Sequence, residues 1–155
     1  MVYSIGGGIE MLALASDHAG FAYKEKIKTV LTDMQLPFVD FGAASNESSD
    51  YPDYGHAAAS AVSKGECDRG ILICGTGIGM SIVANKHKGV RAAACETIEA
   101  AELSRKHNDA NILCLGERLT TWEEAQAIVR IFLKTEFEGG RHERRVSKIH
   151  SLTSC

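Results

Sequence analysis

Residues 70–81 read Gly70-Ile71-Leu72-Ile73-Cys74-Gly75-Thr76-Gly77-Ile78-Gly79-Met80-Ser81, and this stretch indicates the fold most directly. An apolar run that ends at Cys74 predicts a buried strand, and the closely spaced glycines after it predict a tight turn that leads into a helix. Glycines at this spacing let several backbone N–H groups converge on one point, just before the helix N-terminus. The stretch therefore predicts an anion site, either for a phosphate or for an oxyanion that forms during a reaction.

Short apolar runs like this one recur along the chain, each followed by a polar turn and then a helical pattern. The runs are continuous rather than alternating, which is typical of strands covered on both faces. They are Met11–Ala15, Phe38–Phe41, Gly70–Ile73, Val90–Cys95 and Asn111–Leu115. The helical patterns are Phe21–Met34, Tyr54–Ser63, Gly79–Lys86, Ile98–Lys106 and Trp122–Lys134, the last with Thr121 as N-cap and Glu124 completing a capping box. This alternation predicts an α/β fold, a Rossmann-like doubly wound sheet of about five parallel strands flanked by helices.

The carboxyl ends of parallel strands are where such sheets bind ligands, so those ends are the first place to look for a site. Polar or reactive residues follow every predicted strand. They are Ser16-Asp17-His18, the loop Ser45–Asp53, Cys74-Gly75-Thr76, Glu96-Thr97 and Gly116-Glu117-Arg118. We expect these segments to converge on one edge of the sheet.

The bulk composition narrows the classes of function. The 155 residues suffice for one domain, and a net charge of −3 gives no reason to expect nucleic acid or an anionic membrane as a partner. Five cysteines, an odd number without a CxxC pair, favour a reducing compartment over a disulfide scaffold. No signal-peptide pattern is present, and no apolar stretch approaches the roughly 20 residues that span a bilayer. We therefore expect a cytoplasmic protein with an N-terminal extension over residues 1–10, one domain over 11–150 and a C-terminal tail over 151–155.

Two nucleotide-binding motifs compete for the glycine loop. A Walker loop requires Lys-Ser or Lys-Thr after the glycines, and neither follows Gly79. A Rossmann fingerprint fits Gly75 and Gly77, but Met80 occupies the third position, where close helix–strand packing requires a small residue. Glu96, at the end of the next strand, lies about where the ribose-binding acid of that fingerprint is expected. A dinucleotide site therefore remains an alternative, as does a tight connection without a function.

Cys74 indicates what the loop is for. At a strand end that faces a helix N-terminus, we expect the helix dipole and nearby N–H donors to favour the thiolate form. This makes Cys74 a candidate base or nucleophile. The alternative, a small packing residue, fits Cys95 and Cys114 better because both lie within predicted strands.

Three further groups of polar residues are candidates for the same site. Asp17-His18 follows the first strand directly; Asp17 alone could be an N-cap, whereas His18 suits a phosphate or a sugar hydroxyl. His107-Asn108-Asp109-Ala110-Asn111 ends a helix with more polar groups than a cap requires. Arg141 and Arg145 would share one helical face and could hold a phosphate dianion, although a solvated basic face is the simpler interpretation. No HxH motif, HExxH motif or carboxylate cluster is present, so we expect a site without a metal.

Together these residues resemble the B-type ribose-5-phosphate isomerase family, which also includes galactose-6-phosphate and allose-6-phosphate isomerases. The resemblance extends over residues 11–149. The matching segments are Ser16–Phe21, Asp50–Pro52, Gly70–Gly79, Ala84–Lys86, Ser104–Asn111 and Glu138–Val146. Each segment is a weak signal alone, but their combination in this order is specific. The extension before the first strand and the terminal Cys155 depart from the family pattern without touching these segments.

The resemblance implies an aldose–ketose isomerase of the pentose phosphate pathway that interconverts D-ribose 5-phosphate and D-ribulose 5-phosphate through a cis-enediolate, without a cofactor. It implies that Cys74 is the general base, that Thr76 and His107 help to open the furanose ring, and that Asp17 orders the sugar hydroxyls. The remaining implied substrate-binding residues are His18, Tyr51, Gly75, Gly77, Gly79, Asn108, Arg118, Arg141 and Arg145, with the loop N–H groups facing the enediolate and His18 and the arginines holding the phosphate.

The resemblance also implies an assembly, because the site of this family lies between two subunits. We therefore expect a homodimer with shared active sites, or a tetramer built from such dimers. A six-carbon sugar phosphate is the close alternative substrate. The alternative from another class is a non-catalytic dinucleotide-binding module.

Overall fold

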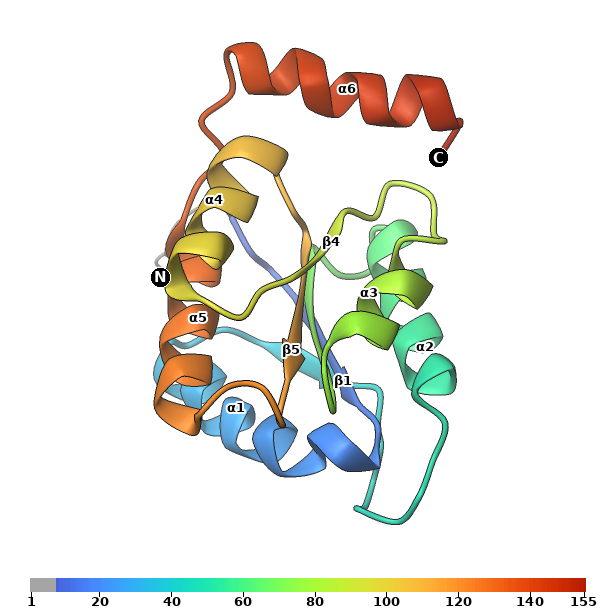
Figure 1. Ribbon diagram of the computed structural model, residues 1–155, viewed down its shortest axis with the longest axis vertical. Helices are drawn as coiled ribbons and strands as arrows, with labels where there is room; N and C mark the ends of the chain where they lie inside the picture. Colours follow the sequence, from blue (N-terminus) through green and yellow to red (C-terminus); the bar gives the residue numbers. More distant parts are fainter. Residues whose placement is uncertain (1–7) are drawn as a thin grey trace.

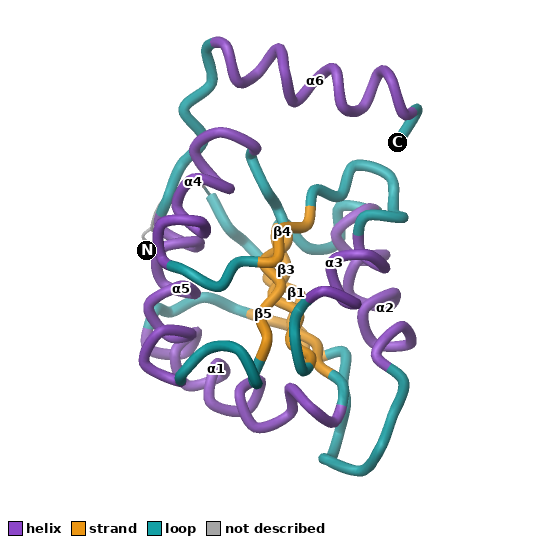
Figure 2. The backbone as a smooth tube through the Cα atoms, in the orientation of Figure 1, coloured by secondary structure: helices purple, strands orange, loops and turns teal. Residues whose placement is uncertain are grey.

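The computed structural model describes residues 8–155, which form a five-stranded parallel sheet between two layers of helices (Figures 1 and 2). The strands are β1 (Leu12–Ser16), β2 (Phe38–Asp40), β3 (Arg69–Cys74), β4 (Ala92–Ala94) and β5 (Ile112–Gly116). Their order is β2-β1-β3-β5-β4, and all neighbouring pairs are parallel. From β1 the chain moves outward to β2 and then returns past β1 to β3, so the winding reverses between β1 and β3. This arrangement confirms the predicted doubly wound α/β sheet.

Helices cover both faces of the sheet. They are α1 (Phe21–Asp33), α2 (Tyr51–Ser63), α3 (Ile78–Ala84), α4 (Ile98–Asn108), α5 (Trp122–Lys134) and α6 (Arg141–Thr153), with a short 3-10 helix, η1 (His18–Gly20), before α1. Helices α1, α4 and α5 pack on one face, and α2 and α3 pack on the other. Helix α6 lies across one end of the molecule, away from the sheet, and buries only His142 and Val146 (Figure 1). Helix α6 continues to Thr153. The predicted boundaries of the N-terminal extension, the domain and the C-terminal tail remain predictions, and most of the extension lies outside the described residues.

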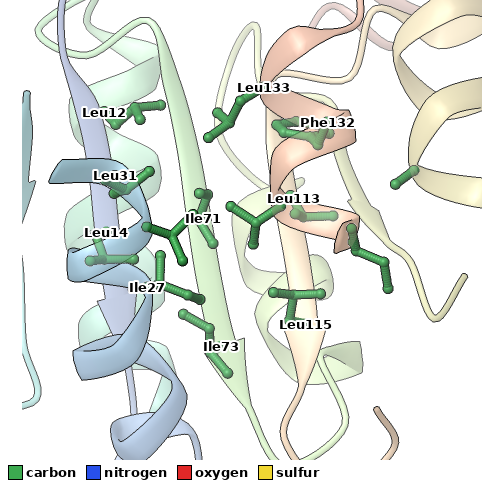
Figure 3. Packing of buried hydrophobic residues seen from close by; sticks show 14 of the residues in the cluster. Leu12, Leu14, Ile27, Leu31, Ile71, Ile73, Leu113, Leu115, Phe132 and Leu133 are labelled. Carbon is green, nitrogen blue, oxygen red and sulfur yellow. The ribbon is translucent and has the colours of Figure 1, made fainter. Parts of the chain in front are cut away.

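Side chains of the three central strands alternate between two apolar layers, as the period of a strand requires. The layer toward α1 and α5 takes Leu12, Leu14, Ile71, Ile73, Leu113 and Leu115 from the strands (Figure 3). The layer toward α2 and α3 takes Ala13, Ala15, Leu72, Cys74, Ile112 and Cys114. Because both faces are buried, the central strands read as continuous apolar runs. The same alternation directs Cys74 toward the α2 and α3 side of the sheet.

The structure departs from the sequence prediction at the sheet edges and at α2. Strands β2 and β4 are the edges, are three residues long and are partly exposed, so the prediction that all five strands are covered on both faces is wrong for these two. Cys95 is buried but directly follows β4 instead of lying within it. Helix α2 begins at Tyr51 rather than the predicted Tyr54, since Pro52 is tolerated in the first turn of a helix. The capping box of Thr121 and Glu124 at the start of α5 is confirmed.

A buried charge connects α1 to β2. The side chain of Lys24 is fully buried, and its Nζ donates to Asp40 Oδ2 over 2.7 Å. Lys28 lies at the same distance from that carboxylate oxygen. Burial alone would raise the pKa of Asp40, but hydrogen bonds from Lys24, Lys28 and the Gly42 N–H lower it below its ordinary value. Asp40 therefore contributes to stability mainly by neutralising a lysine that has left water.

We expect Asp40→Ala to lower the free energy of unfolding by about 3 kcal/mol near neutral pH, because Lys24 would then be buried without its partner. Since the folded-state pKa of Asp40 is lowered, its contribution is present above the unfolded-state pKa of about 4 and is lost as the pH falls through the folded-state value. The difference between variant and wild type should therefore shrink in acid, as urea unfolding at a series of pH values would show. Glu25→Ala removes an exposed partner of the same lysine and should cost less than about 1 kcal/mol. Equal losses in the two variants would contradict this interpretation.

Candidate active site

A cleft of ≈ 220 Å³ opens at the carboxyl edge of the sheet, where the winding reverses between β1 and β3. Open α/β sheets bind ligands at such a reversal because the loops on either side of it diverge. The lining residues come from four separate segments and are Asp17, His18, Ala19, Tyr51, Cys74, Gly75, Thr76, Gly79 and Arg118. All of them except Ala19 are residues that the sequence singled out for the site.

Cys74 ends β3 at the base of the cleft and is only 5% exposed. The Gly77 N–H donates to its Sγ over 3.1 Å. Gly77 has a φ of 78°, which residues with a Cβ rarely adopt, so glycine is needed at this position to direct its N–H at the sulfur. This hydrogen bond fixes the position of the sulfur at the base of the cleft. Cys114, on the neighbouring strand, is fully enclosed, and its burial together with the thiols of Cys74 and Cys95 raises its pKa well above the ordinary value.

Two glycines of the loop set the walls of the cleft. A Cβ on Gly79 would lie 2.7 Å from the ring of Tyr51, and a Cβ on Gly75 would lie 3.0 Å from Nη1 of Arg118. The missing side chains allow a phenol ring on one side and a guanidinium on the other to approach the loop backbone closely. The cleft thus combines a thiol, backbone N–H groups and a positive charge.

The β1–η1 turn supplies Asp17 and His18. Asp17 is buried, and its Oδ1 accepts from the Gly20 N–H over 3.1 Å, which confirms the N-cap interpretation while leaving Asp17 in the lining of the cleft. His18 is held by Ser49. The backbone N–H of His18 donates to Ser49 Oγ, and His18 Nδ1 lies 3.1 Å from the backbone nitrogen of Ser49. Because the ring is held through Nδ1, its Nε2 is the nitrogen available for a ligand.

Glu117 connects the Arg118 turn to helix α1. The N-cap residue of α1 is Gly20, which has no side chain to accept a hydrogen bond from the first turn of the helix. Glu117 Oε1 accepts one from the Tyr23 N–H instead, over 2.7 Å. The Tyr23 hydroxyl returns a hydrogen bond to the Thr120 carbonyl over 2.6 Å. A residue 94 positions away in the sequence thus caps α1 and joins it to the loop that carries Arg118.

We expect Glu117→Ala to lower the free energy of unfolding by about 1 kcal/mol, the usual value of a helix cap. It should also raise KM more than it lowers kcat, because the turn that carries Arg118 loses its anchor to α1. Urea unfolding and steady-state kinetics would measure the two effects. Glu117→Gln retains an acceptor oxygen and should lie close to the wild type in both. A Gln variant as impaired as the Ala variant would show that the charge of Glu117, rather than this hydrogen bond, is what matters.

Gly77, a predicted site residue, does not line the cleft itself but contacts the Cys74 sulfur through its N–H, and four other predicted site residues lie away from the cleft altogether. His107 and Asn108 end α4, while Arg141 and Arg145 lie exposed in the first turns of α6. A helix between parallel strands runs back along the sheet, so α4 ends at the edge opposite to Cys74. Figure 1 shows the end of α4 and the whole of α6 at one end of the long axis, with the carboxyl ends of β1, β3 and β5 toward the other. A single chain therefore cannot place these four residues beside the thiol.

His107 lies in a small cluster of its own. Its ring stacks on that of His142, with ring centroids 4.3 Å apart, and Glu138 Oε2 lies 3.8 Å from Nε2 of His142. Burial, the neighbouring imidazole of His107 and the positive charge of Arg141 lower the pKa of His142, although Glu138 opposes them. These surroundings favour the uncharged form of the His142 ring.

A second cavity, larger at ≈ 400 Å³, lies between α6 and the β4 side of the sheet. Asn108 contributes to its lining, together with Arg91 and His150. Arg91 is already engaged there, since its guanidinium donates to Nε2 of His150 over 2.9 Å and lies 3.4 Å from the Asp109 carboxylate. Neither Cys74 nor the glycine loop reaches this cavity, so the smaller cleft is the better candidate for the chemistry.

Sequence reasoning missed two residues that position the site. Ser49 holds His18, and Glu117 holds the Arg118 turn. Both occur in segments that the sequence marked as strand ends, but nothing in their spacing shows which polar residue of a loop turns inward. Their contacts span 31 and 94 residues of sequence, respectively, and only the folded chain brings the partners together.

The fold and the cleft define an α/β protein with a buried thiol beside the backbone N–H groups of a glycine loop, an arrangement suited to proton transfer on anionic substrates. The chain belongs to the Ribose/Galactose Isomerase family, whose sequence profile matches residues 12–149. It is 44% identical over 144 residues to ribose-5-phosphate isomerase B of Escherichia coli, covering 93% of this chain and 97% of that protein. It is 49% identical over 139 residues to the putative sugar phosphate isomerase YwlF of Bacillus subtilis, covering 89% and 93%.

Solved structures agree with this assignment. Ribose-5-phosphate isomerase B of Clostridium thermocellum superposes with a TM-score of 0.91 at 51% identity, covering 93% of this chain and 97% of that one. The enzyme of Mycoplasma genitalium, solved with bound ribulose-5-phosphate, superposes with a TM-score of 0.89 at 44% identity, covering 93% and 96%. The chain is thus an isomerase of the ribose-5-phosphate isomerase B type, an aldose–ketose isomerase. None of its helices within residues 8–155 is long and apolar enough to cross a membrane.

Proposed function

We propose that this enzyme interconverts D-ribose 5-phosphate and D-ribulose 5-phosphate by proton transfer through a cis-enediolate, with Cys74 as the general base. The observation that carries the proposal is the meeting of Cys74, Asp17, His18 and Arg118 in one cleft at the carboxyl edge of the sheet. Three segments far apart in the sequence supply these side chains, and together they offer a base, an orienting carboxylate and two phosphate-binding groups.

In the proposed reaction, the Cys74 thiolate removes the proton from C2 of the open-chain aldose and returns it to C1. The C1 oxygen gains a proton and the C2 oxygen loses one, so that the carbonyl moves from C1 to C2 without any net loss of atoms. The Gly77 N–H donates to the Cys74 sulfur and holds it in place, and the other N–H groups of the loop from Gly75 to Gly79 would face the enediolate oxygens. Asp17 orders the hydroxyls, and Thr76 assists opening of the ring.

The proposal requires a second copy of the chain. His107, Asn108, Arg141 and Arg145 of that copy would complete the cleft, since their own chain holds them at the opposite end of the molecule. Four apolar side chains on α3 and α4, namely Ile78, Ile82, Ile98 and Leu103, are between 37% and 57% exposed in the isolated chain. Exposed apolar side chains of this size are expected to become buried in an interface between copies. We propose a homodimer with shared sites, with a tetramer of such dimers as a further assembly, located in the cytoplasm and acting without a cofactor.

A substrate panel tests the proposed reaction. Steady-state kinetics with D-ribose 5-phosphate, D-allose 6-phosphate and D-galactose 6-phosphate should give the highest kcat/KM for the five-carbon sugar. A higher value for either six-carbon substrate would reassign the substrate within the same family. A parallel titration with NAD tests the other class of function, and tight binding of NAD without turnover of any sugar phosphate would refute the proposal.

A further inference from the structure

We propose that His107, Glu138 and His142 form a binding site for a divalent transition-metal ion such as Zn²⁺, and that the ion inhibits the enzyme by occupying the His107 imidazole. The ligand atoms of these three side chains all lie within 4.8 Å of one another. The binding itself depends only on the cluster. The inhibition rests in addition on the function proposed above, in which His107 acts on the substrate.

The ligand set is the first argument for a metal. Two imidazole nitrogens and one carboxylate oxygen are donors that Zn²⁺ and its first-row neighbours prefer, and three protein ligands leave a position open for water. The sequence places Glu138 four residues before His142, but it does not show that His107, in the last turn of α4, lies beside them.

The charge of the cluster is the second argument. Glu138 brings a negative charge to the cluster, which attracts a cation and repels an anion. Arg141 and Arg145, which begin α6, oppose a cation, so the binding depends on direct coordination of the ion by the two imidazoles and the carboxylate. Within residues 8–155, moreover, the ring nitrogens of both histidines have no hydrogen-bond partner, and the closest polar contact is the 3.8 Å separation from Glu138. Their lone pairs are thus available to a metal.

The scaffold around the cluster is firm enough to hold a metal. His142 is 7% exposed and fixed by packing. The Glu138 N–H donates to the Lys106 carbonyl over 3.2 Å, which ties the segment before α6 to the last turn of α4. The neighbouring Arg105 is buried, and its Nε donates to the Thr135 carbonyl at the other end of that segment. The two rings are stacked with an interplanar angle of 13°, so their in-plane lone pairs do not yet converge. Because ligand atoms around tetrahedral zinc lie about 3.4 Å apart, the half-buried His107 ring has to turn out of the stack, together with the exposed Glu138, to complete the site.

Titration of the metal-free full-length protein with Co²⁺ tests the site, since tetrahedral Co²⁺ with nitrogen and oxygen ligands gives visible absorption without thiolate charge-transfer bands. We expect Glu138→Gln to weaken Co²⁺ binding at least about tenfold, because one of three ligands loses its charge. Glu143→Gln, the same change at an exposed glutamate in the first turn of α6, is the matched control and should bind as the wild type does. His142→Asn should abolish the signal.

Zinc inhibition of ribose 5-phosphate turnover should weaken by the same factor in Glu138→Gln and be reversed by EDTA. Equal Co²⁺ affinity in the wild type and in Glu138→Gln, or a thiolate spectrum that persists in His142→Asn, would overturn the site in favour of a cysteine. Turnover in a protein that binds no Co²⁺ would refute the metal site alone. Normal Co²⁺ binding in a protein that isomerises no sugar phosphate would support the site while refuting the proposed function.

Discussion

Cys74→Ala is expected to lower kcat by about 10²–10⁴-fold, the usual range for loss of a general acid or base. KM should change little, because His18 and Arg118, which we propose to bind the phosphate, lie on other segments of the cleft. The alanine removes only the sulfur at the end of β3, so the strand and its register should persist. Steady-state kinetics and exchange of the C2 proton with solvent deuterium would measure the effect. A variant that keeps near-normal kcat would exclude Cys74 as the base.

Cys114→Ala is the matched control for this substitution. Cys114 lies on β5, next to β3, in the same apolar layer as Cys74 and is also buried. Its thiol does not line the cleft, so its loss should reduce stability slightly and leave kcat near that of the wild type. A comparable loss of kcat in both variants would indicate that disturbed packing, not loss of a base, causes the effect.

Mixing two inactive variants is expected to restore activity. Cys74→Ala lacks the base, and the double variant Arg141→Ala with Arg145→Ala lacks the proposed phosphate contacts from α6. In a dimer of one chain of each kind, one site receives Cys74 from one chain and both arginines from the other, whereas the second site lacks both. Random exchange makes about half of the dimers mixed, so about one quarter of the wild-type sites should be restored.

The measurement is turnover at a substrate concentration well below KM, before and after the two variants have exchanged subunits. The control is the same mixture of Cys74→Ala with Cys74→Ala plus Arg145→Ala, in which no combination of chains contains the Cys74 thiol. Activity that stays at the sum of the separate variants after exchange would contradict a site shared between copies. It would leave the cleft of a single chain as the complete site.

The central part of the fold could be predicted from the sequence because burial on both faces leaves a simple pattern. Strands β1, β3 and β5 have no exposed side and read as unbroken apolar runs, and the predicted Gly70–Ile73 lies within the observed β3. The edges were predicted less well. Strand β4 is shorter than the predicted strand Val90–Cys95. An edge strand ends where its hydrogen bonds to its single neighbour end, but the apolar run in the sequence extends further on both sides.

The candidate site was predictable to the extent that each residue follows a strand. Asp17, Cys74 and Arg118 meet because the carboxyl ends of parallel strands share one edge. Position in the sequence did not show that Glu117 caps α1 or that Ser49 holds His18. Those contacts depend on which way a loop side chain turns, and that direction is set by packing between segments far apart in the chain.

By itself, the sequence determined the doubly wound sheet, the glycine loop and the place of Cys74 at its mouth, since periodicity and glycine spacing are local properties. Only the tertiary structure decided which of the remaining candidate residues lie in the cleft of the same chain and which lie far from it. It placed His107, Asn108, Arg141 and Arg145 at the opposite end of the molecule and gathered His107 with Glu138 and His142. The physical reason is the return path of α4, which carries its last turn to the amino edge of the sheet while β3 delivers Cys74 to the carboxyl edge.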